Sequence, residues 1–423
     1  MRVGGSVQVP GDKSITHRAL LFAALAPGTS RIRGALTSLD ARSSARVLRQ
    51  LGADIGALRT GHEVKIRGQG RFQRPTSALN CGNSGTTARL LLGLLAAHPF
   101  PAALTGDASL RRRPMRRVTE PLTQMGATFE GRDPDRLPLV VHGGALKPLE
   151  WELPVSSAQL KSALLLAGAA SGVSVGIREP AGLSRDHTER LLRSLGFTVT
   201  TTTDGWIRLT SDGAFQPLDL AVPGDPSSAA FLVGAAILAE GGDLRIAGVG
   251  VNPTRIGFLN VLRRMGATVG VEGEHDRCGE PTADLIATPA TLTGTEVLPG
   301  EVPGLIDEIP LLAVLASRAS GTTIFREVGE LRVKESDRLA LIADNLNAVG
   351  AKAVARENTL IVEGTGLAPR GNVITDGDHR IAMAFAVLGL APGADVRVDD
   401  LACAAVSFPR FPETLQRITR RSR

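Results

Sequence analysis

The sequence of 423 residues has a formal net charge of +6 and is 43% hydrophobic, as expected of a globular protein. It contains no apolar stretch near the ~20 residues of a membrane-spanning helix, and no signal-peptide pattern. The three cysteines, Cys81, Cys278 and Cys403, show neither metal-binding nor redox spacing, which predicts a cytoplasmic protein.

The basic charge raises the possibility of nucleic-acid binding, above all at the run RRRPMRR of residues 111–117. Single-strand binding uses aromatic platforms, whereas this chain has no Tyr and only 3% aromatic residues. The arginines are also spread along the whole chain, so we expect neither a nucleic-acid nor a membrane partner.

Six times along the chain, a short polar loop leads into a helix of small and aliphatic residues. Such helices must be buried on all sides, while their free N–H groups point towards the polar loops. This pattern predicts several helix N-termini facing a charged ligand. The six segments are 9–25, 80–96, 154–170, 222–238, 302–316 and 375–390.

A second, amphipathic helix is expected after each buried one. Five of these six helices end on an apolar residue, a glycine and then Ala or Phe, at Gly52, Gly126, Gly196, Gly266 and Gly350. Glycine at this place is a C-cap signal. The signature recurs roughly every 70 residues, too long for an ordinary solenoid repeat and suited to a compact α/β unit.

Six such units fit two lobes of three better than one domain. The loops near Gly11 and Pro223 are the natural crossings. We therefore expect one lobe of residues 12–223 and a second of residues 1–11 and 224–423.

The polar loops of the first lobe suggest anion binding. Lys13 and Ser14 stand at a helix start with Arg18 one turn further, a candidate clamp for carboxylate or phosphate. The chain has 6 Lys against 42 Arg, so the lysines within motif loops, Lys13, Lys161 and Lys334, are candidates for a specific role.

Two further loops of this lobe could hold oxyanions. The glycine-rich loop around Gly85 opens a buried helix and could cradle an anion, with Arg113 at the mouth of the next helix. Ser157 and Gln159 could bind a phosphate without net charge, although helix capping would also explain one serine.

The second lobe contributes charged loops. Asp307 and Glu308 begin a buried helix, a position that the helix dipole alone would favour for acids. Lys334 and Arg338 are four residues apart, which predicts one helix face, and Arg380 opens another buried helix.

Taken together, these segments resemble the 5-enolpyruvylshikimate-3-phosphate synthase family. Seven motifs match in the same order over essentially the whole chain: PGDKSITHRAL, GNSGTTARLL, LTGDASLRRRPM, SSAQLKSALLLAG, SRDHTERLL, VKESDRL and DGDHRIAMAF. The resemblance implies an α/β fold, the two-domain inverse α/β barrel with three βαβαββ repeats per domain and the active site in the cleft between them.

The resemblance also implies an activity. Members transfer the enolpyruvyl group of phosphoenolpyruvate to the 5-hydroxyl of shikimate 3-phosphate in the shikimate pathway. They need no metal or organic cofactor, and glyphosate occupies their phosphoenolpyruvate site. We expect the same small-molecule substrates here, and a monomer.

The family's functional residues can be carried over onto matching positions. Those implied for shikimate 3-phosphate are Lys13, Ser14, Arg18, Ser157, Ala158, Gln159, Asp307 and Lys334. Those implied for phosphoenolpyruvate are Lys13, Gly85, Arg113, Gln159, Arg338 and Arg380. Asp307 is implied as the base for the hydroxyl proton, and Lys13 and Glu335 as the groups that handle the methylene proton.

This chain departs from the family pattern at several positions. Ala158 stands where other members use a serine on the phosphate, and Val406 stands where many carry a lysine. His187 and Glu330 replace a common Tyr and Asn.

Two alternatives differ in activity. The UDP-N-acetylglucosamine enolpyruvyltransferases share the fold but use a loop cysteine, which the loop 107–115 lacks. A basic RNA-associated protein would leave Asp307 and Glu335 unexplained.

Overall fold

The computed structural model describes residues 1–180, 182–277 and 279–420. The chain divides into two compact units. Unit 1 contains residues 1–10, 223–276 and 281–423, and unit 2 contains residues 11–222 and 277–280. The chain thus changes unit between Pro10 and Gly11 and between Val222 and Pro223, and the short segment 277–280 groups with unit 2.

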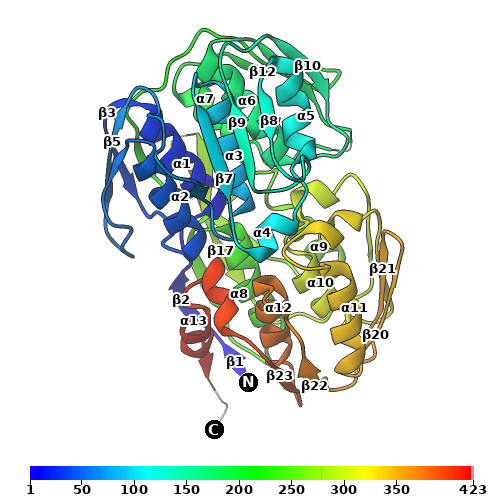
Figure 1. The fold of residues 1–423 in the computed structure, drawn as a ribbon. Helices are drawn as coiled ribbons and strands as arrows, with labels where there is room; N and C mark the ends of the chain where they lie inside the picture. Colours follow the sequence, from blue (N-terminus) through cyan, green and yellow to red (C-terminus); the bar gives the residue numbers. More distant parts are fainter. Residues whose placement is uncertain (181, 278, 421–423) are drawn as a thin grey trace. The chain divides into compact units, whose positions relative to one another are not determined.

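Unit 2 is built from three βαβαββ repeats (Figure 1). The first contains α1 (Lys13–Leu25), β3 (Pro27–Arg33), α2 (Leu39–Gln50), β4 (Asp54–Ile55), β5 (Val64–Gln69) and β14 (Asp219–Ala221). The second contains β6 (Leu79–Asn80), α3 (Gly85–Ala96), β7 (Pro101–Thr105), α4 (Ala108–Arg112), α5 (Arg116–Met125), β8 (Thr128–Glu130) and β9 (Leu139–His142). The third contains β10 (Leu149–Glu152), α6 (Ala158–Ser171), β11 (Val175–Arg178), α7 (His187–Ser194), β12 (Val199–Thr201) and β13 (Trp206–Leu209).

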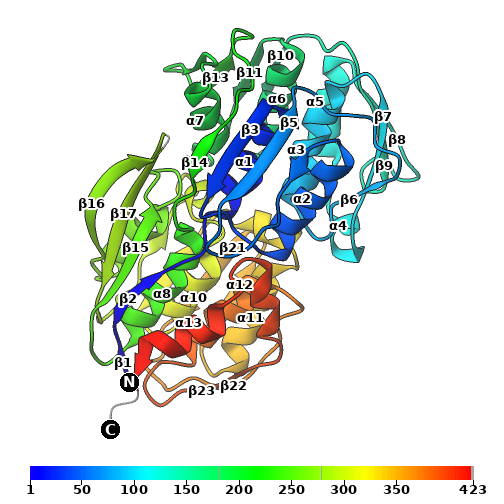
Figure 2. The same cartoon turned by 90° about the vertical axis from the view of Figure 1, so that its left-hand side faces the viewer.

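Unit 1 also contains three repeats (Figure 2): two follow the same plan, whereas the sheet of the third has two strands and the expected closing strand pair is absent from its described residues. Its first repeat contains β2 (Gly5–Gln8), α8 (Pro226–Leu238), β15 (Leu244–Gly250), α9 (Gly257–Arg264), β16 (Gly270–Arg277) and β17 (Glu280–Ala287). The next contains β18 (Glu296–Val297), α10 (Ile309–Ala316), β19 (Thr322–Phe325), α11 (Arg338–Ala348), β20 (Lys352–Arg356) and β21 (Thr359–Glu363), with 3-10 helices η1 (Val302–Gly304) and η2 (Gly329–Val333). The last contains β22 (Arg370–Val373), α12 (His379–Leu388), β23 (Asp395–Val398), η3 (Ala402–Val406) and α13 (Phe411–Ile418). Strands β1 (Arg2–Val3) and β24 (Thr419–Arg420) pair the two ends of the chain.

The six sheets of these repeats share one pairing rule. In each, the first strand pairs in parallel with the second, as in β6–β7 and β18–β19. A parallel pair needs a crossover, and in the four sheets whose first two strands are consecutive in the chain the buried helix supplies it. Strands β2 and β14 are exchanged: β2 precedes α1 but pairs with β15, and β14 precedes α8 but pairs with β3. This exchange accounts for the two points at which the chain changes unit.

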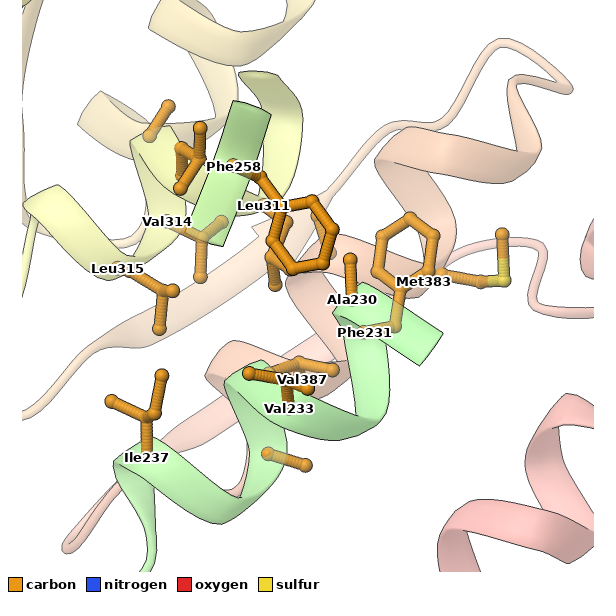
Figure 3. Packing of buried hydrophobic residues seen from close by; sticks show 14 of the residues in the cluster. Ala230, Phe231, Val233, Ile237, Phe258, Leu311, Val314, Leu315, Met383 and Val387 are labelled. Carbon is orange, nitrogen blue, oxygen red and sulfur yellow. The ribbon is translucent and has the colours of Figure 1, made fainter. Parts of the chain in front are cut away.

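The six predicted apolar helices are confirmed as α1, α3, α6, α8, α10 and α12, and they form the centres of two separate cores. In unit 1, Phe231 and Val233 of α8 and Leu311 and Val314 of α10 belong to one buried cluster (Figure 3). The predicted glycine caps are also confirmed, because all five adopt positive φ, from +85° at Gly196 to +114° at Gly126. A residue with positive φ at the end of a helix is least strained when it is glycine, because glycine has no Cβ.

We predict that Gly93→Ala destabilises the chain. Gly93 lies on α3, where an added Cβ would be 2.0 Å from the Ala163 carbonyl oxygen of α6, so the two helices would have to separate. Overpacking of this kind costs about 1–3 kcal/mol, which urea unfolding would detect as a lower midpoint. Gly144→Ala is the matched control, since its Cβ meets nothing within 4 Å. Equal midpoints for the two variants would contradict the close helix contact.

Candidate active site

Lys13 is the first residue of α1 and its ammonium has an acidic partner. Asp12 caps the helix by accepting a hydrogen bond from the Ile15 N–H at 2.8 Å. The Lys13 Nζ lies 2.5 Å from Oδ2 of Asp40, a buried residue in the first turn of α2. The sequence analysis missed Asp40 because acids are common in the first turn of any helix.

Arg18 is buried, with 2% of its surface exposed. Its Nε donates to Thr188 Oγ1 at 2.6 Å, Nη2 to Ser162 Oγ at 2.6 Å and Nη1 to the Ser14 carbonyl at 3.0 Å. Burial lowers the pKa of Arg18 to about 10, so the side chain stays charged at neutral pH. Arg18 therefore joins α1 to α6 and α7, a structural role that the motif did not reveal.

Two guanidinium groups lie over Gly85 at the start of α3. An added Cβ at Gly85 would be 3.2 Å from Arg113 Nη1 and 3.5 Å from Arg89 Nη1. Arg113 is oriented by a hydrogen bond to Asn83 Oδ1 at 2.5 Å, and Arg89 by one to Gln159 Oε1. A glycine at this position is what allows the two cations to approach the helix end.

The start of α6 joins this cluster through Gln159. The Gln159 Nε2 donates to Thr86 Oγ1 at 3.0 Å, so predicted residues from α3 and α6 lie together in unit 2. Ser157 is the N-cap residue of α6, yet its side chain makes no capping hydrogen bond. The capping explanation for this serine is therefore wrong. Ala158, the first residue of the helix, has only its backbone to offer.

Arg185, part of the motif SRDHTERLL but not among the predicted site residues, belongs to the same group. The Arg185 Nη1 lies 3.5 Å from Ser14 Oγ, so it adds a cation near the start of α1. Lys161, by contrast, is buried in ion pairs with Glu179 at 2.9 Å and Glu189 at 2.8 Å. The small number of lysines in the sequence therefore did not show which of them are structural, like Lys161, and which are accessible to a ligand.

In unit 1, Arg338 is the centre of a carboxylate cluster. Its side chain is 0% exposed and contacts Asp378 Oδ2 at 2.8 Å, Asp307 Oδ1 at 3.4 Å and Glu335 Oε2. Burial lowers the pKa of Arg338, but the three carboxylates outweigh this effect and the net shift is upward. One guanidinium thus holds together the two acids to which the resemblance assigns proton transfer.

Asp307 and Glu308 are adjacent but have different surroundings. Asp307 also contacts Arg380, whose Nη2 is 3.5 Å from Asp307 Oδ2 and whose Nη1 donates to the Asp307 carbonyl at 3.1 Å. Glu308 is buried and accepts from the Ser227 hydroxyl of α8. Glu308 therefore links the start of α10 to α8, whereas Asp307 contacts Arg338 and Arg380.

The predicted helix face shared by Lys334 and Arg338 is wrong. Asp337 caps α11 by accepting from the Ala340 N–H at 3.0 Å, so the helix begins at Arg338 and Lys334 lies before it. Lys334 is partly exposed.

Val406 and His187 are two of the positions at which this chain departs from the family pattern. Val406 is the last residue of the 3-10 helix η3. His187 is buried, with its Nδ1 2.7 Å from Glu280 Oε1.

Across the described part of the chain, no cluster of three or more His, Cys, Asp and Glu side chains could hold a metal ion. Among the same residues, no helix combines the length and apolar character needed to cross a membrane. Cys278, which the sequence analysis considered with Cys81 and Cys403, lies outside the described residues.

Nearly the whole chain is similar to proteins of one enzyme family. Residues 1–415 match the family model of EPSP synthase (3-phosphoshikimate 1-carboxyvinyltransferase). The 3-phosphoshikimate 1-carboxyvinyltransferase of Paramagnetospirillum magneticum is 47% identical, over 98% of this chain and 94% of its own length. That of Desulfitobacterium hafniense is 45% identical, over 99% and 96%.

Solved structures agree with these matches. EPSP synthase from Acinetobacter baumannii superposes with a TM-score of 0.86 at 40% identity, covering 99% of this chain and 96% of that one. The enolpyruvyl transferase NikO from Streptomyces tendae, at 19% identity and a TM-score of 0.79, shares the fold. The family match over nearly the whole chain, together with the expected repeats, shows that the chain belongs to the EPSP synthase family of 3-phosphoshikimate 1-carboxyvinyltransferases.

Proposed function

We propose that the chain transfers the enolpyruvyl group of phosphoenolpyruvate to the 5-hydroxyl of shikimate 3-phosphate, giving 5-enolpyruvylshikimate 3-phosphate and phosphate. The observation that carries this proposal is the cluster in which Arg338 contacts both Asp307 and Glu335. A reaction with one proton to remove from oxygen and one to add to carbon needs two such groups.

We assign eight residues to the binding of shikimate 3-phosphate. These are Lys13, Ser14, Arg18, Ser157, Ala158, Gln159, Asp307 and Lys334. The N-terminal N–H groups of α6 favour a phosphate, and the Ser157 hydroxyl is not used for capping. Arg18 would act through its charge and by holding the Ser14 backbone, because its guanidinium is buried and hydrogen-bonded.

We assign phosphoenolpyruvate to Lys13, Gly85, Arg113, Gln159, Arg338 and Arg380. The cations over Gly85 suit a carboxylate or phosphate, since arginine binds either with paired hydrogen bonds. Arg338 is fully buried, so it would contribute charge and orient Asp307 and Glu335.

The reaction then follows from the roles of three residues. Asp307 accepts the 5-hydroxyl proton as that oxygen bonds to the enol carbon, while Lys13 and Glu335 deliver a proton to the methylene carbon. The product of this step is a tetrahedral phospho-intermediate. Removal of a methyl proton by the same groups breaks the bond to phosphate, expels inorganic phosphate and restores the carbon–carbon double bond, which is now the enol ether of the product. The protein itself supplies every proton acceptor and donor in this scheme.

An assay of phosphate release tests the proposal directly. Purified protein should release phosphate from phosphoenolpyruvate only when shikimate 3-phosphate is present. Release with UDP-N-acetylglucosamine instead would favour the related transferase activity, and release with neither would remove the proposed function. Salt-sensitive retention on RNA without turnover would favour the RNA-associated alternative.

We also propose that the chain works as a monomer in the cytoplasm. Cys81 and Cys403 are free thiols, in keeping with a reducing compartment. The large apolar side chains that are exposed come from separate elements, among them Leu39 of α2 and Val354 of β20. Light scattering of the purified protein would test the oligomeric state.

Lys13→Met should nearly abolish turnover because it removes the proposed proton donor. The single variant would also leave the buried Asp40 carboxylate without its ammonium, which should lower thermal stability. The double variant Lys13→Met, Asp40→Asn separates these effects. It should recover stability but not activity, as measured by thermal unfolding and phosphate release. Near-normal turnover in the double variant would disprove the role of Lys13.

Asp307→Ala and Glu335→Ala should each lower the rate by about 10²–10⁴, the usual scale for a lost acid or base. The variants should differ in isotope exchange. Without Glu335, solvent hydrogen should enter the phosphoenolpyruvate methylene group much more slowly, as followed by NMR in deuterium oxide. Exchange as fast as in the unmodified protein would reassign carbon protonation to Lys13 alone.

Gly85→Ala should weaken inhibition by glyphosate, a known ligand of the family. The new methyl group would lie 3.2 Å from Arg113 Nη1 and take space from the inhibitor. One extra carbon in a tight pocket changes affinity by roughly 10–200-fold, which inhibition measured against phosphoenolpyruvate would show. Gly144→Ala should leave inhibition unchanged. Inhibition that does not compete with phosphoenolpyruvate would remove the basis of this prediction.

A further inference from the structure

Four buried ionised side chains lie together behind the start of α6. They are Lys161 of α6, Glu179 just after β11, Glu189 of α7 and Arg18 of α1. The side chains of the lysine and the two glutamates are 0–2% exposed. Lys161 pairs with both glutamates, and Glu189 also interacts electrostatically with Arg18. Two cations and two carboxylates therefore balance one another inside unit 2.

Charge balance explains why the group can be buried. An isolated buried ion is costly, and breaking a buried pair leaves the other ion uncompensated. Burial lowers the pKa of Lys161, but the nearby Glu189 and Glu179 outweigh this effect and raise it. Lys161 is thus held as the ammonium, and both glutamates contribute, Glu189 more than Glu179.

Glu179 differs from Glu189 in its other contacts. Its Oε1 accepts from the Ser157 N–H at 3.0 Å and the Ser184 hydroxyl at 2.5 Å, and its Oε2 accepts from the Ser184 N–H at 3.0 Å. Glu189 meets Lys161 through Oε1, while its Oε2 has no hydrogen-bond partner among the described residues. Of the two glutamates, Glu179 is therefore the one hydrogen-bonded to both loops, whereas Lys161 itself donates to the Ser184 carbonyl at 3.1 Å.

Both loops lie close to residues assigned above to shikimate 3-phosphate. Ser157, the N-cap residue of α6, is itself assigned to this substrate. Ser184 precedes Arg185, whose Nη1 lies 3.5 Å from the hydroxyl of the assigned residue Ser14. In four of the buried helices, α1, α3, α8 and α12, the N-cap side chain turns inward and accepts from the backbone. At α6 the fixed group is instead the Ser157 N–H, held by Glu179. Its hydroxyl is left for another partner.

We propose that Glu179 is a positioning residue of the phosphate subsite: it fixes the Ser157 and Ser184 loops so that the Ser157 hydroxyl faces the phosphate of shikimate 3-phosphate. This inference rests on the proposed function. Glu179 would not touch the substrate itself, and it would act through the backbone of Ser157.

A pair of matched variants tests this proposal. Glu179→Gln and Glu189→Gln remove the same charge beside Lys161 at equal burial. All partners of Glu179 are donors, so a glutamine NH₂ group must oppose at least one of them. At Glu189 the NH₂ group can occupy the side of Oε2, which faces no donor among the described residues.

The expected result is a selective loss of substrate affinity. Calorimetry should show shikimate 3-phosphate binding at least tenfold weaker in Glu179→Gln than in Glu189→Gln, a difference of about 1.4 kcal/mol. At saturating shikimate 3-phosphate, kcat should fall much less than the affinity. Equal weakening in both variants would mean that the glutamates only balance charge, and would overturn the proposal.

Glu179→Asp provides a second test of the positioning role if Glu179→Gln does not fold. Aspartate retains the charge for Lys161 but is shorter by one methylene group, so it should unfold near the normal temperature yet bind shikimate 3-phosphate more weakly. Normal binding by this variant would overturn the positioning role. If the unmodified protein failed to bind shikimate 3-phosphate at all, the proposed function would fail instead.

Discussion

A helix that is apolar on every face can meet water or a ligand only at its ends. The six crossover helices impose this constraint on the whole chain, since each must be covered by sheets and by the other helices of its unit. The ends are joined by polar side chains: Gln159 of α6 reaches Thr86 of α3, and Arg380 of α12 reaches Asp307 before α10. The chemistry is therefore concentrated at helix N-termini, where free N–H groups favour anions.

The two units use buried charge differently. In unit 2, the ions behind α6 neutralise one another, and the cations near Gly85 are held by neutral partners such as Asn83. In unit 1, Arg338 is surrounded by three carboxylates. The first arrangement suits the anion-binding roles proposed for Arg113 and Lys13. The second holds Asp307 and Glu335 beside one cation, which suits the proton-transfer roles proposed for them.

Much of the fold could be predicted because its signals are local and repeated. Each repeat is marked in the sequence by an all-apolar helix, a glycine cap and a β-rich run. Gly52 and Gly350 adopt positive φ, which glycine does without strain. The six repeats therefore followed from periodicity together with the family resemblance, but the βαβαββ pattern predicted for all six is wrong for the last, whose sheet has two strands. The exchange of β2 and β14 between sheets has no such local signal, because strand pairing joins residues far apart in the sequence.

The sequence by itself determined which residues could carry charge to the helix ends, and the motif order was enough to indicate the family. It could not separate functional from structural ions: Asp307 and Glu308 are neighbours, and Lys13 and Lys161 both lie in the first turns of buried helices. Only the tertiary structure decided that Glu308 binds Ser227 and that Lys161 pairs with Glu179 and Glu189. The reason is physical, since the role of an ionisable side chain depends on its burial and on partners that other elements supply.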